Sequence, residues 1–511
     1  MLYDKKFLKQ LLVLFVGVAA LCKVSGGMAI AVVFPVIFWA ISQKRSEWLL
    51  AMLFYLPLAT CTNQELIPKT AGSLMIIRGG MVSLGAIMTF MVFGRHKGLF
   101  IAPLLGILGY VFYMFVPSMM GWAPLVSFFK LFLFIFMFLG YASIGGLIMT
   151  DQRDNIPKVR SAMIAFGIYI AVFSVILLIV RPGMAYMSMD DMTEAELLAN
   201  LAGGAVSLFK GMTQHSQVMG PMAAMICVLF AGDYLFSVRR HLWIYDVIIA
   251  CAMVCLWKSS SRTAMGTVLI GLMVLGWCFM GARGIGSKWK RIVLNLAVVA
   301  GIMGVLAVIA VAPLRESLLG FVLKYGGSDS QALKMMTTED ILASRQSKLD
   351  GALYNWRKSP VIGNGFQVSE DMSSVKSIKE MITMPVEKST WVYANLEEGG
   401  VVGSLIFVVW VMMAFFALRR RHVYVGLSCF VAMLTLNMGE YTIFSLSYTG
   451  AVVWCVVIAG CIMDSQRYKL EKLNHIKASE QEAAFLAMMR AGEMRGDGRE
   501  VVWVRPKGMR R

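Results

Sequence analysis

The sequence has few charged residues and few histidines for its length. Asp, Glu, Lys and Arg together make up 15% of the 511 residues and only five histidines occur, whereas 58% of the residues are hydrophobic. A water-soluble domain of this size cannot bury so much apolar surface, and the mean hydropathy of +0.69 agrees with that conclusion. The composition excludes an ordinary soluble enzyme and predicts a membrane protein with many spans.

Patterns that bind metals or nucleotides are also missing. All nine cysteines lie in or at the ends of apolar segments, and no His or acid accompanies them at the spacing of metal ligands. Neither a P-loop nor a Rossmann glycine pattern is present. We therefore expect no metal, no cofactor and no disulfide framework, and we interpret the cysteines as small packing residues.

The net charge of +18 does not indicate nucleic-acid binding. The basic residues form short clusters at the ends of apolar segments, which is the positive-inside pattern of membrane proteins. With a cytoplasmic N-terminus, the predicted inner segments include the clusters at 5–9, 239–240 and 419–421, whereas the short outer loops hold few cations. The pattern places both termini in the cytoplasm.

Apolar runs that approach the roughly 20 residues needed to cross a bilayer follow one another along the chain, so we expect an all-α polytopic protein with about 12–14 transmembrane helices. The runs are 7–22, 27–42, 47–61, 72–93, 99–116, 124–149, 159–181, 216–236, 242–257, 262–281, 291–312, 391–418, 423–438 and 442–463. They divide the chain into a transmembrane bundle (1–312), a large extracytoplasmic loop (313–390), closing transmembrane helices (391–463) and a basic cytoplasmic tail (464–511).

The loop 313–390 is the one long polar interruption between apolar runs. Arg345 precedes a stretch in which Leu349, Leu353 and Trp356 recur at helical spacing, so a helix with Arg345 near its start is predicted. Gly363-Asn364-Gly365 predicts a turn, which either brings the backbone close to a ligand or merely changes the chain direction.

Several cations fall in the predicted outer half of the membrane, against the inward bias of the others. These cations are Arg78, Lys130, Arg181 and Arg262. Positive charge there suits an anionic headgroup such as the diphosphate of a polyprenyl-linked sugar, although such side chains also snorkel to the interface. In Ser259-Ser260-Ser261-Arg262, three hydroxyls precede an arginine at a predicted helix start, a further anion-binding pattern.

His215 is the only histidine on the predicted outer side, in Thr213-Gln214-His215-Ser216-Gln217. It is a candidate general base or a hydrogen-bond donor to a diphosphate, and the alternative is a helix cap. Glu387 and Lys388 lie where the large loop re-enters the membrane, where a capping or ion-pair role competes with a catalytic one.

Taken in order, these motifs resemble the O-antigen ligase and Wzy-type polysaccharide polymerase family of bacterial membrane proteins. The matching pieces cover roughly residues 200 to 440 and are 211–217 with Gly220, 259–263, 344–345, 359–366 and 398–403. The resemblance implies a metal-independent glycosyltransferase of the bacterial inner membrane. Such an enzyme moves a glycan from an undecaprenyl diphosphate carrier to an acceptor hydroxyl on the outer face.

The family's diphosphate-binding arginines carry over onto Arg262 and Arg345, and Arg78 and Lys388 are further predicted ligands. Many members have a His-Asn pair before the closing motif, whereas this chain has Ser389-Thr390. Either His215 or Glu387 is then the catalytic base, or the acceptor hydroxyl needs less assistance from a base. The acceptor is lipid A core, a protein or a growing polysaccharide, and the sequence does not distinguish ligase from polymerase.

A polysaccharide flippase or another transporter is the alternative, because transporters also carry cations among many spans. They more often consist of two pseudo-symmetric halves with charged sites near the bilayer midplane. Here the unusual cations gather at one face, and a single large loop breaks the symmetry. The pattern favours the enzyme.

Overall fold

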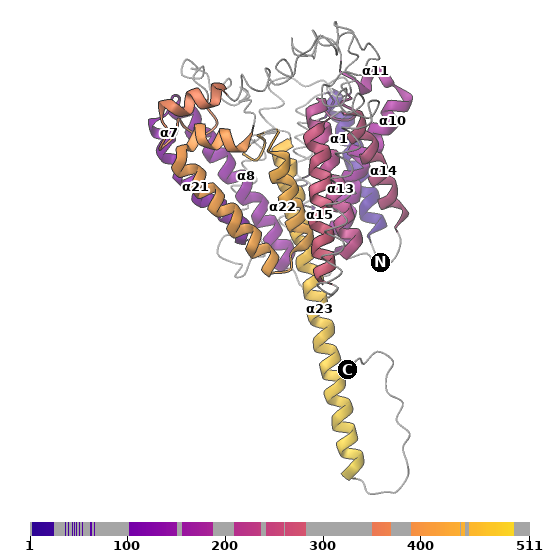
Figure 1. Cartoon of the computed structure of the whole chain (residues 1–511). Coiled ribbons are helices and arrows are strands. Elements are labelled where there is room, and N and C mark those ends of the chain that lie inside the picture. The colour runs from indigo at the N-terminus through magenta and orange to yellow at the C-terminus, as the bar shows by residue number, and fades with distance from the viewer. Residues whose placement is uncertain are drawn as a thin grey trace, which may run out of the picture. The chain divides into compact units, whose positions relative to one another are not determined.

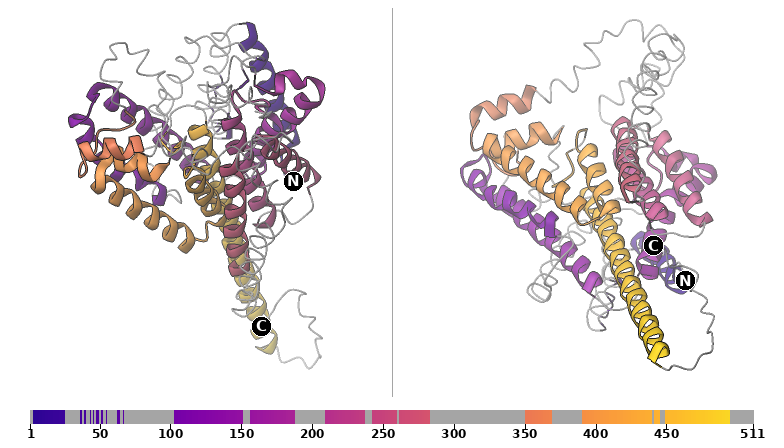
Figure 2. Two further views of the ribbon diagram at one scale, coloured as in Figure 1. Left: turned by 45° about the horizontal axis from the view of Figure 1, so that its top comes forward. Right: turned by 60° about the horizontal axis from the view of Figure 1, so that its bottom comes forward.

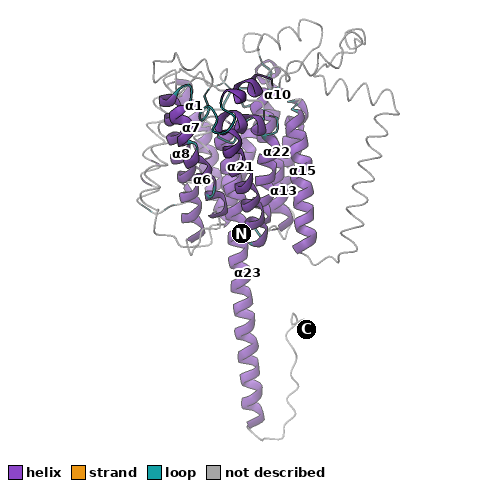
Figure 3. Ribbon diagram, turned by 60° about the vertical axis from the view of Figure 1, so that its left-hand side comes forward, coloured by secondary structure: helices purple, strands orange, loops and turns teal. Residues whose placement is uncertain are grey.

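The computed structural model describes residues 3–24, 102–150, 156–187, 209–236, 242–259, 261–282, 350–368, 390–439, 441–444 and 449–494, with a few single residues between 36 and 66. Regular structure in this part of the chain is helical, apart from two isolated β-bridges, Thr62–Thr213 and Tyr186–Phe209 (Figure 3). The predicted all-α class is confirmed.

The helices follow one another with short connections wherever the structure describes both ends. They are α1 (Lys5–Val24), α5 (Ala102–Leu105), α6 (Ile107–Tyr113), α7 (Phe115–Met120), α8 (Pro124–Thr150), α9 (Ile156–Gly167), the π-helical turn η1 (Ile168–Val172), α10 (Phe173–Val180), α11 (Pro182–Ala185), α13 (Ser216–Phe236), α14 (Trp243–Lys258), α15 (Arg262–Ala282), α21 (Trp391–Arg420), α22 (Tyr424–Leu436) and α23 (Thr449–Met494). Residues 350–358 are also helical, as predicted for the large loop.

Six helical stretches in the described residues are long and apolar enough to cross a membrane: Pro103–Met120, Pro124–Gly146, Ile156–Val180, Ser216–Phe236, Arg262–Ala282 and Trp391–Arg420. Large apolar side chains are exposed on their outer faces, for example Leu405 and Met413 on α21. The shorter α14 exposes Trp243 and Trp257 at its two ends, where interfacial aromatic residues are expected. The chain is a multi-pass membrane protein.

Each predicted span within the described residues falls on a helix or on successive helices: the run 99–116 is divided among α5, α6 and α7, and the run 159–181 passes through α9, η1 and α10. The runs 27–42, 47–61, 72–93 and 291–312 lie wholly or almost wholly outside the described residues. One boundary is wrong: the sequence predicts helix from residue 442, but α23 begins at Thr449. The physical reason is a turn, because the side chain of Asn437 accepts hydrogen bonds from the N–H groups of Thr442 and Ile443.

Residues 1–465 form one compact unit, and residues 466–511 form a second. In the first unit, α6, α7, α8 and α21 make one group of helices, and α1, α9, α10, α13, α14 and α15 make another (Figure 1). Two further views show the same division (Figure 2). Helix α22 packs on α13 and α15 and also on α21, so it joins the two groups.

Glycines bring α13 close to its neighbours, as small residues do between membrane helices. A Cβ added at Gly271 of α15 would lie 2.6 Å from Cγ2 of Val228, and one added at Gly232 of α13 would lie 2.8 Å from Cγ1 of Val425. Gly220 near the start of α13 lies against Ser261, and Gly232 further along lies near Leu275. Helices α13 and α15 therefore run parallel.

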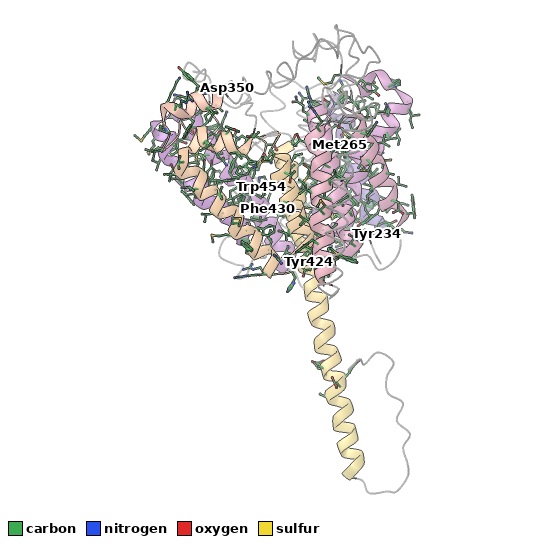
Figure 4. The ribbon with its side chains drawn as sticks, in the orientation of Figure 1. Tyr234, Met265, Asp350, Tyr424, Phe430 and Trp454 are labelled. Atoms are coloured by element: carbon green, nitrogen blue, oxygen red, sulfur yellow. The ribbon has the colours of Figure 1, made fainter. Side chains whose placement is uncertain are left out.

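The bundle has two ends, the Arg262 end and the Asp464 end. At the Arg262 end, α13, α15 and α21 begin and α22 ends; at the Asp464 end, α13 ends and α22 begins. Met265 marks the first of these ends, and Tyr234 and Tyr424 mark the second (Figure 4). At the Asp464 end, the Asp464 carboxylate accepts hydrogen bonds from the N–H groups of Val425 and Gly426 and so caps α22.

A buried ion pair between Arg160 and Asp233 also lies towards the Asp464 end. Together with Tyr245, which bonds to Asp233, it is called the Asp233 cluster. Arg160 donates from Nε and Nη2 to the two Asp233 carboxylate oxygens at 2.8 and 3.0 Å, and the Tyr245 hydroxyl donates to Oδ2 at 2.6 Å. Asp233 is fully buried and Arg160 is 4% exposed. The cluster fastens α9, α13 and α14 to one another.

Candidate functional site

The first turns of α13 and α15 lie side by side at the Arg262 end. Because Gly220 has no side chain, Ser261 packs directly against it; an added Cβ would overlap Ser261 and lie 3.0 Å from Oγ of Ser259. The first N–H groups of a helix lack intrahelical partners, and the helix dipole is positive there. Two parallel helices that begin side by side place two such positive ends together.

His215 precedes α13 and caps it. Its carbonyl accepts hydrogen bonds from the N–H groups of Val218 and Met219, and its ring Nδ1 accepts one from the N–H of Gln217 at 3.1 Å. A backbone N–H is always the donor, so Nδ1 is unprotonated and the ring proton lies on Nε2. The half-buried imidazole is thus both a helix cap and, at Nε2, a hydrogen-bond donor.

The loop that carries His215 is held by buried polar groups of other elements. Asn63 Nδ2 donates to the carbonyls of Met184 and Gly211 at 2.8 and 2.9 Å, and Asn63 is fully buried. The N–H of Met212 donates to Ser174 Oγ at 2.8 Å. Sequence analysis missed Asn63 and Ser174, because a single polar residue in an apolar context carries no motif.

Arg262 is the first residue of α15, as the serine-rich motif predicted, and its side chain is half-buried. The next residue, Thr263, packs against Gly439 just beyond the end of α22. Arg262 therefore lies where the starts of α13 and α15 meet the end of α22.

The start of α21 is bonded to the same region. The N–H of Trp391 donates to the carbonyl of Asn437 at 3.0 Å, and Thr390 caps α21 by accepting from the N–H of Tyr393. Glu387 and Lys388 lie outside the described residues but are joined to this point by the chain. The structure thus brings His215 and Arg262 to the end of the bundle where α21 begins.

The other predicted ligands have different positions. Arg78 and Arg345 lie outside the described residues. Lys130 is 6% exposed and its ammonium donates to the carbonyl of Gln367 at 2.8 Å, so it anchors the large loop to α8. Arg181 is exposed beyond α10 and contacts the sulfur of Met184.

The glycine turn of the large loop packs against a kink in α21. Gly363 has φ +93°, and Gly400 at the kink has φ +64°, both in the region that favours glycine. The N–H groups of Asn364 and Gly365 donate to the carbonyls of Glu397 and Glu398 at 2.9 and 3.1 Å. A Cβ at Gly363 would overlap the Glu398 backbone, so the close approach serves helix packing and leaves no space there for a ligand.

No group of His, Cys, Asp and Glu suited to a metal occurs among the described residues. The cations and donors of the Arg262 end instead suit an anion such as a phosphate or diphosphate. In comparisons with known proteins, the chain matches no family model and no curated protein.

Proposed function

We propose that this protein is a membrane glycosyltransferase of the O-antigen ligase or Wzy-type polymerase kind, acting on a glycan carried by undecaprenyl diphosphate. One observation carries the proposal: the starts of α13 and α15 lie side by side and bring His215 and Arg262 to one end of the bundle. Two positive helix ends, a guanidinium and an imidazole N–H form a suitable site for a diphosphate leaving group.

The proposed reaction is a displacement at the anomeric carbon. The acceptor hydroxyl oxygen forms a bond to that carbon, the bond from the carbon to the carrier oxygen breaks, and the electron pair leaves with the diphosphate. Arg262 and the Nε2–H of His215 stabilise the leaving charge, with Arg78, Arg345 and Lys388 as further proposed ligands. Since Nδ1 of His215 already accepts a hydrogen bond, we assign the proton of the acceptor hydroxyl to Glu387.

The proposed location is the bacterial inner membrane, with the Arg262 end outside and both chain termini in the cytoplasm. The distribution of charge supports this orientation. The basic residues 419–421 directly precede α22 at the Asp464 end. Lys5 begins α1 at the same end, where the N–H of Asp4 donates a hydrogen bond to the carbonyl of Pro157 in α9. Under the positive-inside rule that end is cytoplasmic.

The test is reconstitution of the purified protein in vesicles with carrier-linked glycan. Wild type is compared with Arg262→Ala and with Arg420→Ala, a matched control because Arg420 is an exposed arginine at the end of α21, towards the Asp464 end. Release of undecaprenyl diphosphate that depends on Arg262 but not on Arg420 supports the proposal. A ladder of lengthening products identifies a polymerase, and a single transfer to another acceptor identifies a ligase.

A different outcome would support transport. If the carrier stays intact while the glycolipid changes leaflet, the protein is a flippase and the cations of the Arg262 end belong to its pathway.

A further inference from the structure

The turn 437–444 between α22 and α23, described apart from residue 440, is hydrogen-bonded to its neighbours through Asn437. The Asn437 side-chain oxygen accepts hydrogen bonds from the N–H groups of Thr442 and Ile443 at 2.6 and 2.7 Å, and its Nδ2 donates to the carbonyl of Met433 at 2.7 Å. Its own carbonyl accepts from the N–H of Trp391 at the start of α21. Fully buried Asn437 therefore joins three segments.

Two more side chains hold the same turn. The Tyr441 hydroxyl lies 3.1 Å from Oε2 of Glu398 and 3.2 Å from Oδ1 of Asn395, both buried on α21. Burial and the neighbouring Glu398 carboxyl raise the pKa of Tyr441 well above its ordinary value, so the hydroxyl keeps its proton and donates. On the other side, Trp454 Nε1 of α23 donates to the carbonyl of Ile443 at 2.7 Å.

Gly439 of this turn lies against the first turn of α15. A Cβ at Gly439 would overlap Oγ1 of Thr263 and lie 2.8 Å from its Cβ. Thr263 follows Arg262 directly. The turn is thus in contact with the helix that carries Arg262 and is hydrogen-bonded to the start of α21, which belongs to the other group of helices.

We propose that the turn 437–444 sets the position of Arg262 relative to the start of α21, and that Asn437 and Gly439 are positioning residues of the transferase site. The proposal rests on the proposed function, because it assigns the two groups of helices different parts of one reaction. In that proposal α15 brings Arg262 as the cation for the leaving diphosphate, and the group of helices that includes α21 serves the acceptor side of the reaction. Their spacing then determines whether both act on one substrate.

The experiment, in the full-length protein, introduces a steric clash between residue 439 and Thr263 and then removes it with a second substitution. Gly439→Ala pushes Thr263 away, whereas Gly439→Ala combined with Thr263→Gly removes the side chain that the new Cβ meets. Gly266→Ala is the matched control, because Gly266 is also on α15 and an added Cβ there meets nothing within 4 Å. Thr263→Gly alone gives the baseline for the double variant. Each protein is assayed for melting temperature in detergent and for kcat and KM of carrier release.

We expect Gly439→Ala to lower kcat by roughly 10²-fold, since a displacement of about 1 Å in a catalytic arrangement costs that much. The double variant should regain most of the rate of Thr263→Gly, and Gly266→Ala should match wild type. In Asn437→Asp, which keeps the side-chain acceptor, kcat should stay nearer to wild type than in Asn437→Ala.

Two results would overturn the positioning role while leaving the transferase intact: an unchanged kcat in Gly439→Ala, or a double variant as slow as Gly439→Ala itself. If Gly439→Ala does not fold, the double variant and the Asn437 pair still decide the question. Absence of carrier release in wild type would overturn the proposed function and the positioning role together.

Discussion

Two polar regions of helix α13 differ in how their charges are accommodated. Near the end of α13, Asp233 is fully buried and accepts two hydrogen bonds from Arg160 and one from Tyr245. Before its start, His215 and the neighbouring Arg262 are half-buried and lie at helix N-termini. One region encloses an ion pair within the protein, and the other places two half-buried polar side chains at neighbouring helix starts.

The comparison separates two roles for a charge in a membrane protein. A charge among apolar helices is costly, and it is stable only when a partner satisfies it. The Asp233 cluster satisfies its charges with bidentate geometry and so has a structural role. In the proposed function, the helix starts at the Arg262 end offer positive potential to the anionic substrate. Variants at the two regions should therefore fail in different ways.

The largest effect on stability is expected for Asp233→Ala. Removing the carboxylate leaves the Arg160 guanidinium buried without its partner, which costs about 3–5 kcal/mol. The expected result is a large drop in melting temperature in detergent and in the yield of folded protein. Tyr245→Phe, which removes one of the hydrogen bonds to Asp233, is the milder companion. Equal melting temperatures for Asp233→Ala and wild type would contradict a structural role.

The largest effect on activity is expected for Arg262→Ala. Loss of one preorganised group that stabilises transition-state charge lowers rates by roughly 10²–10³-fold, whereas a half-buried residue at a helix start should change the melting temperature little. Arg262→Lys should recover only part of the rate, because an ammonium lacks the planar fork of the guanidinium. The measurement is carrier release beside thermal unfolding of the same samples, and a destabilised but fully active variant would reverse the comparison.

The fold was predictable from sequence because membrane spans are long and their signal is strong. Helices α8, α13, α15 and α21 begin and end within a few residues of the predicted runs. The start of α23 was missed, because Tyr441, Ile443 and Phe444 are apolar enough to extend a span and only the bonds to Asn437 show that they form a turn.

The site was only partly predictable for a related reason. Arg262 stands out because it is a cation on the predicted outer side, against the positive-inside rule, and His215 because it is the only histidine predicted there. Asp233 pairs with Arg160, 73 residues away, and Asn63 bonds to Gly211, 148 residues away. The hydropathy pattern contains no information about such distant pairs. The role of the loop glycines was left open by sequence, and the structure assigns Gly363 to packing against Glu398.

A smaller effect distinguishes the two chemical roles considered for His215. If Nε2–H donates to the diphosphate, His215→Gln retains a donor amide near that position and should keep most of the wild-type activity. His215→Asn keeps the cap but not the donor, so it should lose about 1.5–3 kcal/mol of binding to a charged group. The assay is kcat/KM for carrier release. Equal, severe losses in both variants would favour a general base instead.

The smallest effect concerns the loop turn. Gly363→Ala must hold a positive φ against the Glu398 backbone, a strain of about 1–3 kcal/mol, and should lower the melting temperature by several degrees. Gly351→Ala, in the helix of the same loop and with nothing within 4 Å of the added Cβ, should not lower it. Because the close approach at Gly363 is to protein backbone, loss of stability should accompany any loss of activity. An intact melting temperature with abolished carrier release would instead assign the turn to substrate binding, and the accessible region would then extend from the starts of α13 and α15 to the large loop.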